Sequence, residues 1–268
     1  MVDMYVHGYD LTETTRLQDQ ATTLAELLHC DTTYPSGSRV LEVGCGVGAQ
    51  TVTLASKSPD AFITSIDMSE SSLAVAGKRV KEAGIENVCF QQADIYKLPF
   101  PTGSFDHVFI CFVLEHLARP MEALLRLKDL LKAGGTITVI EGDHGSTFFH
   151  PDSEAADRVI QCLVELQRRA GGNAMIGRQL HPLLCEAGYS SVRVSPRMVY
   201  ADSSRPDLVV GFTKKTFVAM IEGVRESVLK AGMIDQLYFD RGIKDLYRTA
   251  EPDGVFCYTF FKAFGKKG

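Results

Sequence analysis

The stretch VLEVGCGVGAQ, Val40–Gln50, constrains the fold more than any other part of the sequence. Apolar residues that suit a buried strand are followed by three alternate glycines, Gly44, Gly46 and Gly48, and then by a segment that predicts a helix. Glycine permits positive φ and lets another group approach the backbone closely. Exposed N–H groups at a helix N-terminus favour an anionic group. The stretch therefore predicts a strand, a ligand-contacting turn and a helix at the carboxyl edge of an open α/β sheet.

Predicted strands and helices alternate along the first half of the chain. The predicted strands are 38–43, 62–67, 87–94, 105–112 and 136–141. The predicted helices between them are 48–57, 69–83 and 120–132. This alternation favours right-handed βαβ units and a parallel sheet. The nearly continuous apolar strands agree with that sheet, because helices cover both of its faces.

The pattern changes after residue 141. Residues 142–151 are predicted to form a loop. Further helices are predicted at 153–170, within 178–190, at 206–231 and at 235–249. Further strands are predicted at 191–201 and 254–265, which brings the sheet to seven strands.

We expect one domain over residues 1–268. Residues 38–200 and 254–265 form its core of sheet and helices. Residues 1–35, with an amphipathic helix at 11–29, form an N-terminal helical cap segment, and residues 205–250 form an inserted helical cap. We expect both caps to lie over the carboxyl edge of the sheet.

Composition removes several classes of function. No apolar run approaches the ~20 residues of a membrane helix, and the first residues do not resemble a signal peptide, so a cytoplasmic protein is expected. The net charge is −5 and no basic face is visible, so nucleic acid is not an expected partner. The seven cysteines include no C-x-x-C pair, so neither disulfides nor a zinc site is expected. A homodimer is left open.

Two known patterns fit the glycine turn. Gly44-x-Gly46-x-x-Ala49 satisfies a dinucleotide-binding fingerprint. Glu42-x-Gly44-x-Gly46-x-Gly48 resembles motif I of the class I S-adenosylmethionine-dependent methyltransferases. The later stretches SIDMS, QADIYKLPFPTGSFDHVF, ICFVLEHLARP and LKAGGTITVIEGD follow in the order found in that family.

Over residues 38–200 the chain therefore resembles the small-molecule branch of this family. The resemblance implies a Rossmann-like, doubly wound, seven-stranded and mostly parallel sheet, with the last strand antiparallel and with helical cap elements. It also implies S-adenosylmethionine as cofactor, S-adenosylhomocysteine as product and a small-molecule substrate. The acceptor atom (oxygen, nitrogen, carbon or sulfur) stays open.

The resemblance assigns the cofactor contacts residue by residue. The implied positions are Glu42, Gly44, Cys45, Gly46, Gly48, Asp67, Met68, Asp94, Ile95, Cys111 and Phe112. The glycine turn would contact the methionine part of the cofactor, and a backbone carbonyl at Cys111 or Phe112 would accept from its ammonium group. Asp67 would accept both ribose hydroxyls, Met68 would lie along the adenine, and Asp94 with the Ile95 N–H would contact the adenine edge.

Each of these assignments has a structural alternative. Glu42, implied to lie near the cofactor's ammonium group, could instead brace the turn. Asp67 could cap the next helix, although Ser69 can also serve as that cap. Met68 could be an ordinary buried methionine, and Asp94 could be a turn carboxylate.

Catalytic residues are harder to assign, because a general base is required only when the acceptor must lose a proton. The candidates are His144, His116 and Glu141, which follow the fifth and fourth strands. His144 could instead be a loop histidine bonded to backbone, and His116 could pack against the sheet edge. Further candidates for substrate or cap contacts are Tyr5, Tyr9, Arg16, Asp143 and His150. No metal is expected.

The inserted segment is predicted to wall the acceptor pocket. The residues expected there are Phe212, Phe217, Met220 and Tyr238, which could equally be helix-packing residues. The competing functions are an NAD(P)-dependent oxidoreductase and a non-catalytic S-adenosylmethionine-binding module.

Overall fold

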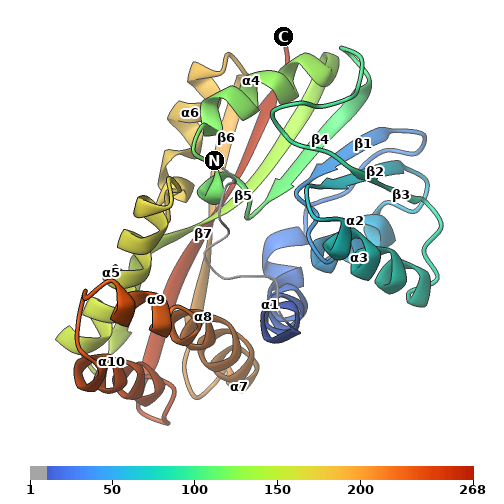
Figure 1. Ribbon diagram of the computed structural model, residues 1–268. Helices are drawn as coiled ribbons and strands as arrows, with labels where there is room; N and C mark the ends of the chain where they lie inside the picture. Colours follow the sequence, from blue (N-terminus) through green and yellow to red (C-terminus); the bar gives the residue numbers. More distant parts are fainter. Residues whose placement is uncertain (1–10) are drawn as a thin grey trace.

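A single seven-stranded sheet organises the computed structural model, which describes residues 11–268 (Figure 1). Its strands are β1 (Arg39–Val43), β2 (Phe62–Asp67), β3 (Val88–Gln92), β4 (Phe105–Cys111), β5 (Leu131–His150), β6 (Ser190–Ala201) and β7 (Val255–Lys266). The strand order is β3-β2-β1-β4-β5-β7-β6. From β3 to β5 in this order, each strand pairs in parallel with its neighbours. Strand β7 runs antiparallel to both β5 and β6. The predicted fold class is therefore confirmed.

Helices cover both faces of this sheet. The helices up to residue 186 are α1 (Leu11–His29), α2 (Ala49–Lys57), α3 (Glu70–Glu82), η1 (Leu114–His116), α4 (Pro120–Leu130), α5 (Glu154–Arg169), η2 (Ile176–Gln179) and α6 (Leu180–Glu186). Successive strand residues point to opposite faces. Val40 accordingly packs in one hydrophobic cluster with α2 and α5, and Leu41 packs in a second cluster with α4 and α6.

The segment between β6 and β7 forms a helical layer at one end of the molecule. Its elements are α7 (Pro206–Leu208), η3 (Val209–Val218), α8 (Ala219–Gly223), α9 (Arg225–Lys230) and α10 (Gln236–Arg248). The element η3 is a π-helix, a rare form that is frequent at functional sites. It packs against α1, while α10 packs against α5 (Figure 1). The helical region predicted over 206–231 thus consists of four elements.

The predicted loop at 142–151 is wrong, because β5 continues to His150. After a register shift between Asp143 and Phe148, the strand pairs again with β7 at Phe149↔Phe256 and His150↔Val255. Glycines and polar residues favoured a loop locally, but long-range pairing with β7 satisfies the backbone groups instead. As a result β5 and β7 extend past the parallel strands to the helical layer (Figure 1).

Within residues 11–268, none of the helices has the length and apolar character needed to cross a membrane.

Candidate functional site

The glycine turn after β1 is fixed by hydrogen bonds to the end of β2 and by close packing at two of its glycines. The N–H groups of Gly44 and Cys45 both donate to the Ile66 carbonyl at the end of β2, at 2.8 and 3.0 Å. Gly44 has φ +68°, and a Cβ atom there would lie 2.5 Å from Val113 Cγ2. Gly48 has φ +75°, and a Cβ atom there would lie 2.9 Å from Ala76 Cβ. These two glycines are therefore required by the chain's own packing.

Gly46 differs from its two neighbours. A Cβ atom on it would meet nothing within 4 Å, so the backbone faces open space there. Its N–H donates to Asp67 Oδ2 at 2.8 Å, and the Ser69 N–H donates to Asp67 Oδ1 at 2.9 Å. Ser69 itself caps α3 by accepting from the Ser72 N–H. The turn and the Asp67 carboxylate therefore form one unit, which leaves Met68 52% exposed beside it.

Glu42 is buried behind the turn. Its Oε2 accepts hydrogen bonds from Thr51 Oγ1 on α2 at 2.8 Å and from Ser65 Oγ on β2 at 2.6 Å. Burial raises the pKa of this carboxyl to about 7, against the opposing effect of the two hydrogen bonds. The contacts correspond to the bracing alternative, in which Glu42 ties α2 to the sheet.

The other implied cofactor positions lie at the ends of β3 and β4. Asp94 is half-buried and its Oδ1 accepts from the Tyr96 N–H at 2.8 Å, while Ile95 is buried. Cys111 is buried, which raises the pKa of its thiol well above the ordinary value. Phe112 follows it with φ +58°, an uncommon conformation for a side chain of this size. Such backbone occurs mainly where surrounding structure enforces it, often at active sites.

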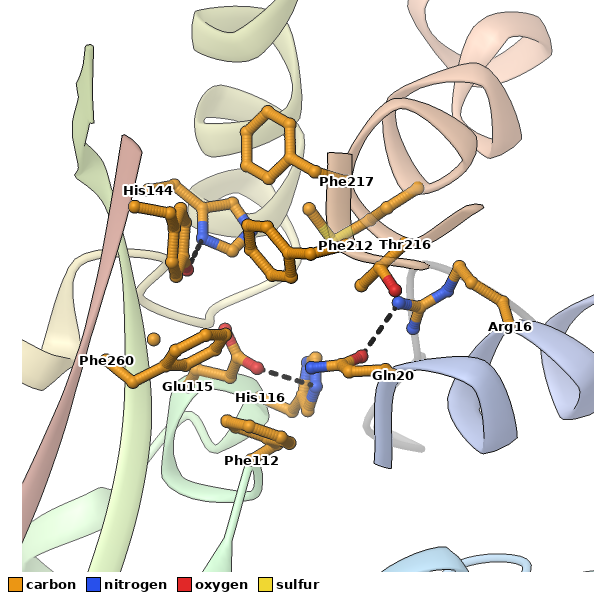
Figure 2. A pocket seen from close by; sticks show the side chains of 13 residues that line it. Arg16, Gln20, Phe112, Glu115, His116, His144, Phe212, Thr216, Phe217 and Phe260 are labelled. Atoms are coloured by element: carbon orange, nitrogen blue, oxygen red, sulfur yellow. Dashed lines mark hydrogen bonds and ion pairs between the residues drawn. The ribbon is translucent and has the colours of Figure 1, made fainter. Parts of the chain in front are cut away.

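A cavity of about 70 Å³ lies between the ends of the strands and the helical layer (Figure 2). We call it the inner cavity. Its polar side chains come from α1, η1, β5 and η3, and its aromatic side chains come from η3, β7 and the residue that follows β4. The lining residues are Arg16, Gln20, Phe112, Glu115, His116, Gly142, His144, Phe212, Thr216, Phe217, Met220, Tyr258 and Phe260.

Three contacts hold the polar wall of the inner cavity. Arg16 is buried and its Nη1 donates to Gln20 Oε1 at 3.0 Å (Figure 2). His116 Nε2 lies 3.5 Å from Glu115 Oε1, and Gln167 of α5 donates to the Glu115 carbonyl at 3.3 Å. Arginine, amide, carboxylate and imidazole groups therefore meet at one end of the cavity.

His144 lies on the opposite side, on β5. The side chain is 6% exposed, and burial lowers its pKa. Its Nδ1 lies 2.7 Å from the Tyr258 hydroxyl of β7. A neutral imidazole beside a phenol is a pair that can move a proton.

Several predicted residues lie away from the inner cavity. Glu141 is buried and its carboxylate accepts from the N–H groups of Val113, Leu114 and Glu115, which fixes the start of η1. Asp143 is paired with Arg178, with Nε–Oδ2 at 2.6 Å.

The remaining candidates lie at the surface or outside the described part. His150 is exposed at the end of β5, and Tyr238 is exposed on α10 and does not line the inner cavity. Tyr5 and Tyr9 lie outside the described residues. Arg16, Phe212, Phe217 and Met220 line the inner cavity.

Tyr258, Phe260, Gln20 and Thr216 line the cavity but were not predicted. The period-two alternation of Phe256, Tyr258 and Phe260 in β7 places these rings on one face of the sheet, and this signal is present in the sequence. In residues 11–268 we find no group of three or more His, Cys, Asp or Glu side chains placed to hold a metal ion.

The strand order and the turn linked to Asp67 define a Rossmann-like methyltransferase fold. The chain belongs to the family of methyltransferase domains, because the family model with that description matches residues 35–188, more than half of the sequence.

Two curated relatives are similar to this chain in sequence. A 37.1 kDa protein of transposon TN4556 from Streptomyces fradiae is 31% identical over 204 residues, covering 75% of this chain and 58% of that protein. A methyltransferase from Schizosaccharomyces pombe, C1B3.06c, is 33% identical over 157 residues, covering 56% of each chain. This chain thus spans little more than half the length of these curated relatives.

A solved structure shows the same fold. Phosphoethanolamine N-methyltransferase 2 from Haemonchus contortus, in complex with phosphomonomethylethanolamine and S-adenosylhomocysteine, superimposes with a TM-score of 0.57 at 19% identity. The match covers 93% of this chain and 53% of that one.

Proposed function

We propose that the protein is an S-adenosylmethionine-dependent methyltransferase that methylates a small molecule held in the inner cavity. The observation that carries the proposal is the Gly46–Asp67 unit, in which the open face of the turn and a carboxylate are joined by one hydrogen bond. Family membership supports the proposal. So does the S-adenosylhomocysteine bound by the Haemonchus enzyme.

The residues at the sheet edge fit an adenosyl cofactor. The space above Gly46 admits a ligand against the backbone, and Asp67 offers a carboxylate for two vicinal hydroxyls. Met68 presents an exposed apolar side chain for a flat ring, and Asp94 and Ile95 follow at the next strand. The cofactor supplies an electrophilic methyl group on a sulfonium.

The protein's own contribution is then to position the acceptor and exclude water. Positioning of this kind is worth up to ~7–11 kcal/mol of a reaction barrier. The inner cavity offers two groups that can take a proton, His144 and His116, and a general base adds ~10²–10⁴ in rate. We give Glu141 a positioning role, because it holds the turn that carries Glu115 and His116.

The small cavity and the net charge of −5 favour a small molecule over nucleic acid as the acceptor. We also propose that the protein acts in the cytoplasm, because thiols buried singly in the core, such as Cys111 and Cys162, suit a reducing compartment. Cell fractionation tests this location, and recovery of the protein in an oxidising compartment contradicts it.

Calorimetric titration tests the proposed function. We expect S-adenosylmethionine and S-adenosylhomocysteine to bind and NAD(H) not to bind. Binding of NAD(H) alone supports an oxidoreductase and contradicts the proposal. Cofactor binding without any labelled methyl transfer to a metabolite extract supports a non-catalytic module instead.

A further inference from the structure

His144 lies between two spaces. It lines the inner cavity, and it also lines a larger groove of about 770 Å³ beside α5. We call this second space the outer groove; its walls include Asp157, Gln161, Glu165, Met175 and Met233. Among the described residues that line either space, His144 alone is common to both.

The chain also makes room for the partner of His144. Gly142 lies on β5 directly below the Tyr258 hydroxyl, and any Cβ atom at residue 142 would collide with that oxygen. Glycine within a strand weakens the strand and commonly marks a close approach of another group. The hydroxyl is therefore held in one place, between Gly142 and His144 Nδ1, and all three residues line the inner cavity.

We propose that Tyr258 and His144 form a proton route from the inner cavity to the outer groove, and that the acceptor methylated there is a hydroxyl compound. This proposal rests on the proposed function. A hydroxyl must lose its proton as its oxygen gains a methyl group, whereas a neutral amine can leave as a methylated ammonium ion. A dedicated route out of a buried cavity is thus needed for a hydroxyl acceptor.

The step balances as follows. The acceptor oxygen forms a bond to the methyl carbon while the carbon–sulfur bond breaks, and that electron pair stays on sulfur. The acceptor proton passes to the Tyr258 oxygen as the Tyr258 proton passes to His144 Nδ1. His144 then releases the hydrogen on Nε2 to water in the outer groove, which leaves both side chains neutral and the histidine hydrogen on Nδ1. Loss of that hydrogen and gain of one from water at Nε2 restore the starting tautomer before the next turnover.

Several charged groups set the acidity of His144. Burial lowers its pKa, Glu115 and Asp143 act in the opposite direction, and His116 and Arg16 lower the pKa further. The Asp143 carboxylate is paired with Arg178, so its effect on the pKa of His144 is reduced. Burial therefore disfavours the imidazolium formed in the step, which favours passing the proton on to water.

The route requires one tautomer, and nitrogen-15 NMR of the histidine rings in the full chain tests this directly. We expect His144 to carry hydrogen on Nε2, to accept at Nδ1, and to exchange its Nε2 hydrogen rapidly with water although the ring is buried. Hydrogen on Nδ1, or an Nε2 hydrogen protected from exchange, overturns the proposal. His181→Asn is the assignment control, because His181 is exposed on α6.

A second arm uses transfer of a labelled methyl group from S-adenosylmethionine to a metabolite extract. We expect O-methylated products, and we expect Tyr258→Phe to lower their yield about 10²-fold or more, with the deficit shrinking as pH rises toward the acceptor's own pKa. Tyr200→Phe, an exposed position on β6, is the matched control. Undiminished yield in Tyr258→Phe, or quaternary ammonium products, overturns the proposal.

Cofactor titration separates this failure from failure of the proposed function. If S-adenosylmethionine binds wild type and Tyr258→Phe equally, and the wild type transfers labelled methyl groups, the proposed function stands, and the two arms above decide the proton route alone. If S-adenosylmethionine does not bind the wild type, the proposed function fails as well.

Discussion

Two buried ionisable residues, Glu42 and His29, have opposite effects on how the stability of the folded state changes with pH. Burial raises the pKa of Glu42 from 4.5 to about 7, so the folded state becomes less stable as pH rises between those values. Burial lowers the pKa of His29 from 6.5 to about 4, so the folded state becomes less stable as pH falls through that range. Each pKa shift corresponds to a change of about 3 kcal/mol in the free energy of unfolding. Between pH 4.5 and 6.5 the two effects cancel.

Single substitutions should expose each effect. We expect the free energy of unfolding of Glu42→Gln to rise with pH between 4.5 and 6.5, and that of His29→Gln to fall, each relative to wild type. Urea unfolding at several pH values measures both slopes. Parallel curves for wild type and the two variants contradict the assignment.

Asp67 is the residue on which cofactor affinity should depend most. Hydrogen bonds to a charged group are worth about 1.5–3 kcal/mol each, so Asp67→Asn should weaken S-adenosylmethionine binding at least about tenfold. Asp60→Asn, an exposed aspartate after α2, is the matched control and should bind as wild type does. Equal affinity of wild type and Asp67→Asn in calorimetry would exclude Asp67 as a cofactor contact.

The sequence predicts that the turn contacts a ligand, but it does not show why each of the three glycines is needed. Gly44 and Gly48 avoid Val113 and Ala76, which are distant in the sequence, whereas Gly46 faces open space. Likewise Glu141 was predicted as a catalytic candidate from its place after a strand. Its three backbone partners on the β4–η1 turn were not visible in a linear pattern.

At the scale of elements, helices and parallel strands were predictable because their signals are local. The helix at Leu11–His29 agrees with its predicted range, and the last strand differs by one residue at each end. The extension of β5 through Gly145 to His150 was not predictable, because it depends on pairing with β7 more than 100 residues later. The π-helix was also missed, since no local propensity distinguishes it from an α-helix.

The contact between α1 and η3 gives a prediction for these elements. A methyl group on Gly211 would collide with Thr23 of α1, so Gly211→Ala should destabilise the protein by about 1–3 kcal/mol. Gly223 meets nothing within 4 Å, so Gly223→Ala should be neutral or stabilising by up to about 1 kcal/mol. Thermal unfolding measures both changes.

Rescue distinguishes this contact from general damage. Thr23→Ala removes the two nearest atoms, and we expect it to recover part of the stability that Gly211→Ala loses. A double variant no more stable than the additive expectation would show that α1 and η3 are not in the contact described.

At the scale of the whole molecule, the inner cavity combines segments far apart in the chain. Arg16 and Gln20 come from α1, His144 from β5 and Tyr258 from β7. The sequence predicted that both caps lie over the carboxyl edge of the sheet, and in the structure Arg16 of one cap and Phe212 and Phe217 of the other line the same cavity. It could not predict that His144 meets Tyr258, because 114 positions separate them and only the strand register brings them together.

Because the cofactor is predicted to join β1, β2 and β3 at one edge, its binding should stabilise the whole chain. Ligand at about 100 times its dissociation constant adds about 2.7 kcal/mol. For a chain of this size that raises the unfolding temperature by about 5–10 °C. We expect S-adenosylhomocysteine to give this increase in a melting experiment, and an equal increase with NAD(H) would contradict the selectivity.

The most direct measurement for the central claim is a crystal structure of the protein with S-adenosylhomocysteine. The account predicts the ligand against Gly46, with its ribose hydroxyls on the Asp67 carboxylate and its adenine along Met68. A ligand-free sheet edge, or a ribose bound away from Asp67, would contradict it.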